Sequence, residues 1–133
     1  MDVIKPLRLR VRLTSQHGIA MGPGRADLLT LIAQTGSISA AGREMKMSYK
    51  RAWTLVESMN NTFTSPLVET SKGGAERGGA HLTALGATLL AAYKQLEAAT
   101  QAAAAPGLEI FEAALQPPQQ NPDKALNILQ SDV

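Results

Sequence analysis

Cationic and hydrogen-bonding side chains are concentrated in one short stretch of this sequence. Residues 48–54 read Ser-Tyr-Lys-Arg-Ala-Trp-Thr, and two further cations, Lys72 and Arg77, lie in a glycine-rich stretch at 72–79. Guanidinium and ammonium groups bind phosphate oxygens and the acceptor atoms of guanine, and hydroxyl groups bind phosphates as well. The glycines allow a loop to pass close to a sugar-phosphate backbone. These residues predict the binding of a nucleic acid.

The remaining residues disfavour catalysis and metal binding. The chain has no cysteine and only two histidines, His17 and His81, which argues against thiolate catalysis and a zinc site. Gly73 and Gly78 have the spacing of a phosphate loop, but Gly79 stands where that loop needs lysine. No Ser/His/Asp constellation is visible. We expect a protein that is not an enzyme, with His81 as an ordinary hairpin residue.

Length and charge fit a single nucleic-acid-binding domain. The chain has 133 residues and a formal net charge of +2, with a net charge of +5 over residues 1–82 and −3 over residues 83–133. A basic first half on a nearly neutral chain favours a polyanion-facing surface, and a solvated basic face is the alternative. No apolar run is long enough to span a membrane, and residues 1–12 do not resemble a signal peptide. We expect a cytoplasmic protein with no membrane partner.

Hydrophobic periodicity predicts the elements that position the cations. Apolar and basic residues alternate over 7–13, which predicts a half-buried strand with Arg8, Arg10 and Arg12 on its solvent face. Apolar residues at helical spacing then predict three helices, at 24–34, 40–45 and 49–60. Gly36 ends the first of them, and Ser48 caps the third, whose inner face is formed by Ala52, Val56 and Met59.

The second half of the chain predicts a hairpin and a long helix. Residues 67–70 and 80–82 are typical of two strands with a glycine-rich tip between them. Thr83 then caps an Ala/Leu-rich helix that is expected to end near Ala105. Four prolines follow from Pro106 onward, which predicts a short ordered piece at 108–115 and a mobile remainder. The predicted domains are therefore 1–105 and a Pro/Gln-rich, partly disordered tail at 106–133.

This order of elements is that of a winged helix-turn-helix, a mainly α fold with a small β-hairpin and here a long C-terminal helix. The second helix of such a pair fits the major groove of DNA, which is about 12 Å wide. Lys50 or Arg51 is expected to contact either guanine or phosphate, and the side chain of Trp53 either DNA or the core. The candidate DNA-binding residues are Ser37, Ser39, Ser48, Tyr49, Lys50, Arg51, Trp53, Thr54, Lys72 and Arg77.

Several motifs resemble one family in particular. They are Gly-Ser-Ile-Ser-Ala-Ala at 36–41, Met-Ser-Tyr-Lys-Arg-Ala-Trp at 47–53, Met-Asn at 59–60 and the glycine pairs at 73–74 and 78–79. Over about residues 25–96 the chain is similar to the N-terminal DNA-binding domain of ModE, the molybdate-responsive transcription regulator. A looser likeness to LysR-type helix-turn-helix domains exists, but the motif at 47–53 favours ModE.

The resemblance implies a homodimeric regulator that binds double-stranded operators near molybdate-transport or molybdoenzyme genes. In that family the helix after the wing helps to form the dimer, so helix 83–105 is the expected dimerisation helix. Family members that sense molybdate carry C-terminal oxyanion-binding modules, and this chain has a Pro/Gln-rich tail instead. We therefore expect either a stand-alone DNA-binding version or a protein whose partner senses molybdate. No cofactor is expected to bind this chain, and molybdate is linked to it only by family association. The candidate interface residues are Leu85, Leu89, Ala92, Tyr93 and Leu96.

A protein-interaction module that keeps the winged-helix shape but binds no DNA is the alternative. The exposed cations Lys50, Arg51 and Arg77 favour DNA binding over this alternative.

Overall fold

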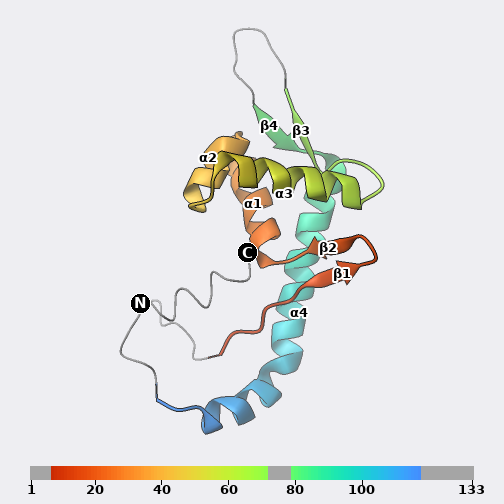
Figure 1. The fold of residues 1–133 in the computed structure, drawn as a ribbon. Helices are drawn as coiled ribbons and strands as arrows, with labels where there is room; N and C mark the ends of the chain where they lie inside the picture. Colours follow the sequence, from red (N-terminus) through yellow and green to blue (C-terminus); the bar gives the residue numbers. More distant parts are fainter. Residues whose placement is uncertain (1–6, 72–78, 118–133) are drawn as a thin grey trace.

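The computed structural model describes residues 7–71 and 79–117 (Figure 1). Its elements in chain order are β1 (Leu13–Ser15), β2 (Gly18–Met21), α1 (Pro23–Thr35), α2 (Ile38–Glu44), α3 (Tyr49–Thr62), β3 (Val68–Thr70), β4 (Ala80–Leu82) and α4 (Ala84–Ala114). Helix α3 crosses in front of α1, the β3–β4 hairpin extends from one end of the helices, and α4 runs away from it (Figure 1). The fold is mainly α with a small antiparallel hairpin and a long C-terminal helix, as predicted.

Local capping signals fix the ends of α1. Gly22 precedes the helix with extended backbone, and Pro23 occupies its first turn, where the missing N–H costs nothing. Gly36 ends the helix in the left-handed region, with φ 71°, and its N–H donates to Ile32 O at 2.8 Å. Gly36 O in turn accepts a hydrogen bond from Ala80 N at 2.8 Å, which ties the end of α1 to the first residue of β4.

Helices α2 and α3 form the helix-turn-helix pair. Ser37 and Ser48 cap them, and Lys46 in the intervening turn has a positive φ of 58°. The two helices approach closely, because a Cβ added at Gly42 would lie 2.9 Å from Ala52 Cβ. Glycine at position 42 therefore permits the contact that sets α3 against α2.

The core lies between α1, α2, α3 and the base of the wing. Its largest fully buried side chains are Leu28, Leu29, Ile32, Met59 and Leu67. The inner face predicted for α3 is confirmed, since Ala52, Val56 and Met59 are all buried. Their burial leaves the opposite face of α3 directed away from the core.

The wing consists of β3 and β4. They pair antiparallel, with Val68 opposite Leu82 and Thr70 opposite Ala80, which confirms the predicted hairpin. The glycine-rich tip at 72–78, with its two predicted DNA contacts Lys72 and Arg77, lies outside the described residues.

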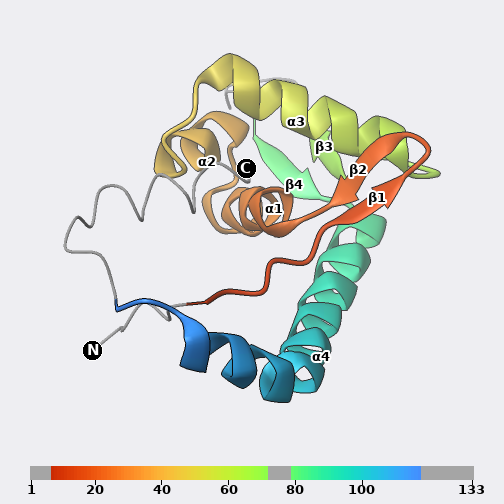
Figure 2. The same ribbon diagram turned by 60° about the horizontal axis from the view of Figure 1, so that its bottom comes forward.

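The predicted strand over 7–13 is wrong. Residues 7–12 form no regular element, and the strand begins only at Leu13, where β1 pairs with β2 through a turn at 16–17. Side chains of α4 take up the backbone acceptors of this segment: Tyr93 Oη donates to Val11 O at 2.7 Å, and Gln101 Nε2 to Leu9 O at 2.9 Å. Figure 2 shows the segment (red) running between α1 and α4. The apolar residues at 7, 9 and 11 are partly buried and Arg8 and Arg12 are exposed, without a neighbouring strand beside this segment. Against the prediction, Arg10 is partly buried and Leu13 is exposed.

Helix α4 ends at Ala114 rather than near Ala105. It continues through Pro106, and its last part (blue) changes direction in Figure 2. Proline removes one helical hydrogen bond and crowds the preceding turn, which bends a helix without having to end it. The four alanines at 102–105 favour helix on the N-terminal side of Pro106. Within residues 7–71 and 79–117, no helix is long and apolar enough to cross a membrane.

Candidate nucleic-acid interface

The outer face of α3 carries exposed polar and cationic side chains. Tyr49 is 61% exposed, and Lys50, Arg51, Thr54 and Glu57 are exposed as well. The buried residues on the opposite side fix the orientation of this face, so the rigid core presents it to solvent. This is the surface that a helix needs to enter a groove of duplex DNA.

The candidate serines act first as helix caps. Ser37 Oγ accepts from Ala40 N at 3.1 Å and lies 3.1 Å from Ser39 Oγ, while Ser48 Oγ accepts from Arg51 N at 3.0 Å. Capping uses oxygen lone pairs, and a hydroxyl keeps a proton that it can donate. The hydroxyl of Thr54 is already a donor, to Lys50 O at 2.9 Å.

Trp53 is half-buried and packs against the hydrophobic core. The centroids of its ring and of the Tyr49 ring lie 6.0 Å apart, at an interplanar angle of 63°, in an edge-to-face contact. Its Nε1 is buried, and the residues described by the structure offer this atom no hydrogen-bond partner. Trp53 thus links the core to the exposed Tyr49 ring. DNA contact by the rest of its side chain stays a prediction.

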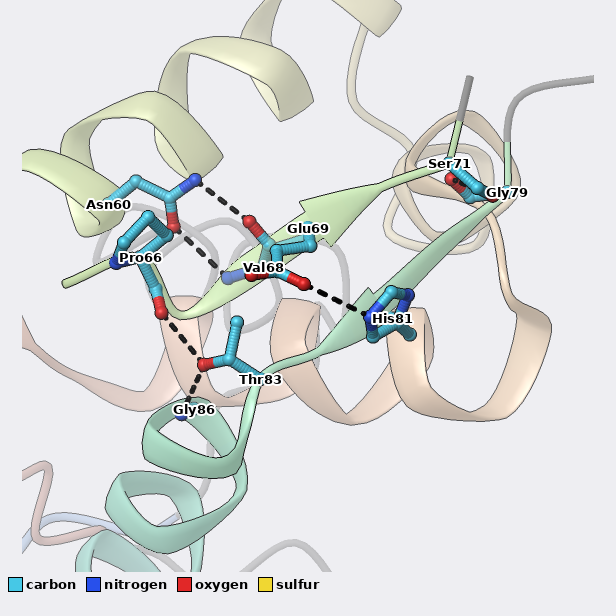
Figure 3. Close-up of polar contacts among 9 residues, drawn as sticks. All are labelled: Asn60, Pro66, Val68, Glu69, Ser71, Gly79, His81, Thr83 and Gly86. Carbon is cyan, nitrogen blue, oxygen red and sulfur yellow. Dashed lines mark hydrogen bonds and ion pairs between the residues drawn. The ribbon is translucent and has the colours of Figure 1, made fainter. Parts of the chain in front are cut away.

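Two polar side chains hold the wing against the helices (Figure 3). At the end of α3, Asn60 Nδ2 donates to Val68 O at 3.0 Å, and Asn60 Oδ1 accepts from Leu67 N at 2.8 Å and from Val68 N at 3.1 Å. At the start of α4, Thr83 Oγ1 donates to Pro66 O at 2.7 Å and accepts from Gly86 N at 3.0 Å. The positions of the wing and of α3 are therefore coupled.

The Thr83 cap was predicted from the sequence, whereas the role of Asn60 was not. The signal available for Asn60 was its place near the end of a helix, seven residues before a strand. In the wing itself, His81 Nε2 lies 3.4 Å from Glu69 Oε2, with both side chains 61% exposed. His81 is a residue of the hairpin, as expected. Exposed ion pairs of this kind contribute little to stability.

The candidate interface residues of α4 differ in their exposure. Tyr93 is buried against its own chain, and Leu85 and Leu89 are partly buried against the core. Ala92 and Leu96 are exposed. A small apolar pocket of about 120 Å³ lies beside them, lined in part by Leu13, Met21 and Phe63. A dimer built on this stretch would thus use Ala92 and Leu96 directly, and the prediction of a dimer interface stays a prediction.

No family model matches the chain. Several curated proteins, however, are similar to the chain in sequence. The chain is 38% identical over 127 residues to the molybdenum-pterin-binding protein MopA of Rhodobacter capsulatus, a match that covers 96% of this chain and 45% of MopA. It is 51% identical over 81 residues to MopB of the same organism, covering 61% of this chain and 30% of MopB. The DNA-binding transcriptional dual regulator ModE of Escherichia coli K12 is 39% identical over 84 residues, covering 63% of this chain and 32% of ModE.

The chain is a homologue of the ModE and Mop proteins. The resemblance predicted from the motifs on α2, α3 and the wing is confirmed at this level. The chain spans less than half the length of each of these three relatives.

The names of these ModE and Mop relatives describe regulators and molybdenum-pterin-binding proteins, and none describes an enzyme. Among residues 7–71 and 79–117, no group of three or more His, Asp or Glu side chains is placed to hold a metal ion.

Proposed function

We propose that this chain is a sequence-specific DNA-binding regulator of the ModE type, acting as a homodimer on operators near molybdate-transport or molybdoenzyme genes. The observation that carries the proposal is the outer face of α3. It presents Tyr49, Lys50 and Arg51 to solvent from a helix whose other side is locked into the core. The E. coli relative, which is named a DNA-binding regulator, supports the same function.

In the proposed complex α3 lies in the major groove. The amine of Lys50 donates to guanine acceptors or to a phosphate, and the exposed Tyr49 ring contacts the groove beside it. The N-terminus of α3, capped by Ser48, lies next to the phosphate backbone, where a helix N-terminus favours anions, and the hydroxyl of Ser37 contacts the same backbone. Lys72 and Arg77 add positive charge from the wing.

The proposed homodimer uses α4. Besides Leu96, which is 38% exposed, this helix leaves Ile110 and Phe111 about 70% exposed. Large apolar side chains exposed on one helix favour its association with another surface. A two-fold dimer places its recognition helices one duplex turn apart, about 34 Å, so the operator is expected to be a near-palindrome.

No bound cofactor enters the proposal, and molybdate is connected with it only through the relatives. The regulator is proposed to act in the cytoplasm, where chromosomal DNA lies.

The test is a selection of bound sequences from a pool of random duplexes, followed by titration of the selected duplex at several salt concentrations, with and without molybdate. We expect a near-palindromic sequence, and an affinity that falls with salt by about 0.9 in logarithmic slope for each neutralised phosphate. Recovery of no sequence, or binding insensitive to salt, would contradict the proposal and favour the protein-interaction module. Identical curves with molybdate would leave DNA binding intact and remove a sensing role.

A further inference from the structure

A cavity of about 230 Å³ lies beside the start of α3 and is lined by three arginines. They are Arg12, from the segment before β1, Arg25, from α1, and Arg51, from α3. The other lining residues are Ile19, Gly22, Gly24 and Leu55, so the described lining contains no Asp or Glu. Arginine side chains from three separate parts of the chain thus line one space large enough for a small ion.

Two of the arginines, Arg25 and Arg51, lie close enough for their positive charges to repel. Arg25 is half-buried, and its Nη1 donates to Ser58 Oγ at 3.2 Å, which holds the side chain between α1 and α3. Burial lowers the pKa of Arg25 from its usual value, and the positive charge of Arg51 lowers it further. Arg12 and Arg51 are the more exposed members of the set. An anion between these groups would relieve their repulsion.

The start of α1 adds backbone to the same cavity. Gly22, the residue before the helix, and Gly24, in its first turn, both line the space and present no side chain to it. Gly22 has no side chain with which to cap this end of the 13-residue helix, and Pro23 has no N–H to offer. The start of a helix therefore borders a cavity that three arginines also line, and a helix N-terminus favours an anion.

We propose that this cavity binds one tetrahedral oxyanion of the phosphate type through Arg12, Arg25 and Arg51. Such an ion has two sources: a phosphate of the DNA backbone or a free inorganic oxyanion. The first source rests on the proposed function, because Arg51 follows Lys50 directly on α3 and a phosphate of the bound duplex would lie close to it. The second source does not depend on DNA binding.

Two titrations of the whole chain distinguish the sources. In the first, inorganic phosphate, sulfate and molybdate are titrated separately into the protein by calorimetry. In the second, the duplex recovered by selection is titrated, first unmodified and then with single backbone phosphates replaced by uncharged methylphosphonates. Both use the wild type, Arg25→Gln and Arg12→Gln.

Arg8→Gln is the matched control, since it removes the same charge from an exposed arginine that lines a different cavity. Ser58→Ala removes the hydrogen bond to Arg25 and keeps the charge of Arg25. This variant therefore shows whether oxyanion binding depends on the position of the Arg25 side chain or only on its charge. Arg12 is exposed, so Arg12→Gln keeps the test valid if Arg25→Gln fails to fold.

We expect Arg12→Gln and Arg25→Gln to weaken oxyanion binding about tenfold or more, and Arg8→Gln to leave it unchanged. If a backbone phosphate is the occupant, both variants also weaken duplex binding and become insensitive to one particular methylphosphonate. If the variants fail to bind the free anion but bind the duplex like the wild type, the site is assigned to an inorganic oxyanion.

Two outcomes separate this inference from the proposed function. If the wild type binds duplex DNA but no free oxyanion, and neither arginine variant changes duplex binding, the inference is overturned and the proposed function stands. If the wild type binds no duplex but binds an oxyanion that Arg12→Gln weakens, the proposed function fails and the inference stands.

Discussion

The side chain of Asn60 bonds both backbone groups of Val68. Asn60 Nδ2 donates to Val68 O at 3.0 Å, and Asn60 Oδ1 accepts from Val68 N at 3.1 Å (Figure 3). The amide side chain thus makes the two hydrogen bonds that the backbone of a neighbouring strand would otherwise make. The last turn of α3 is thereby joined to the first residue of the wing, so the two surfaces proposed to contact DNA keep a fixed relation.

Asn60→Ala is expected to lower the free energy of unfolding by about 1–3 kcal/mol, because the N–H groups of the buried residues Leu67 and Val68 lose their acceptor. Urea unfolding measures the change. Asn61→Ala, at an exposed neighbour, is the control and should stay within about 0.5 kcal/mol of the wild type. Equal stability of the two variants would show that the side-chain bridge contributes nothing.

Gly86→Ala is expected to destabilise the protein by about 1–3 kcal/mol. A Cβ at this position would overlap the backbone carbonyl of Leu67, which cannot move without shifting the wing. Gly107 lies in the same helix with no atom within 4 Å of an added Cβ, so Gly107→Ala should instead stabilise the helix by about 0.5–1 kcal/mol. Thermal unfolding of both variants compares them, and a Gly86→Ala protein as stable as Gly107→Ala would contradict the close packing.

Tyr93 predicts a loss of stability in alkaline solution. Burial, followed by the charge of Glu97, raises the pKa of its hydroxyl above the usual value near 10, and this hydroxyl donates to Val11 O. Because the pKa of this hydroxyl is lower in the unfolded chain, the unfolded chain loses its phenolic proton at a lower pH than the folded protein. The free energy of unfolding is therefore highest below about pH 10 and falls as the pH rises through the folded-state pKa. Urea unfolding from about pH 8 to 11 should show this loss in the wild type and in Tyr49→Phe, and a smaller one in Tyr93→Phe. Identical profiles for all three proteins would exclude a contribution from Tyr93.

The caps and helix faces were predictable because their signals are local. Ser48 and Thr83, the two predicted caps, each accept a hydrogen bond from the residue three positions on, and the sequence contains both partners. Likewise, the spacing of Ala52, Val56 and Met59 defines a helix face without reference to any other segment. These features placed the outer face of α3 correctly before any tertiary contact was considered.

The features that were predicted wrongly or missed depend mostly on contacts between residues that are distant in sequence. The alternation over 7–13 indicates a segment with one side partly covered, but it does not show that the covering element is α4, more than 80 residues away. The end of α4 was misplaced because Pro106 disfavours helix, although a proline can bend a helix without ending it. The cavity between Arg12, Arg25 and Arg51 could not be predicted, since three elements must pack before these residues meet.

The charges of the wing are expected to act through the DNA backbone. The double variant Lys72→Ala/Arg77→Ala should lower affinity for all duplexes similarly and reduce the salt slope by about 0.9 for each phosphate that the wing no longer neutralises. Fluorescence titration at salt concentrations from about 50 to 300 mM measures the change. Lys94→Ala, on α4, removes an exposed charge away from the wing and is the control. A double variant with the wild-type slope would place the wing away from DNA.

The affinity of Lys50→Ala for two duplexes tests the central claim most directly. One duplex carries the sequence recovered by selection, and the other has the same bases in scrambled order. If α3 reads the major groove through Lys50, the variant loses about 1–3 kcal/mol of its preference for the selected duplex and keeps most of its affinity for the scrambled one. A variant that discriminates between the two duplexes as well as the wild type would contradict recognition through Lys50 on the outer face of α3.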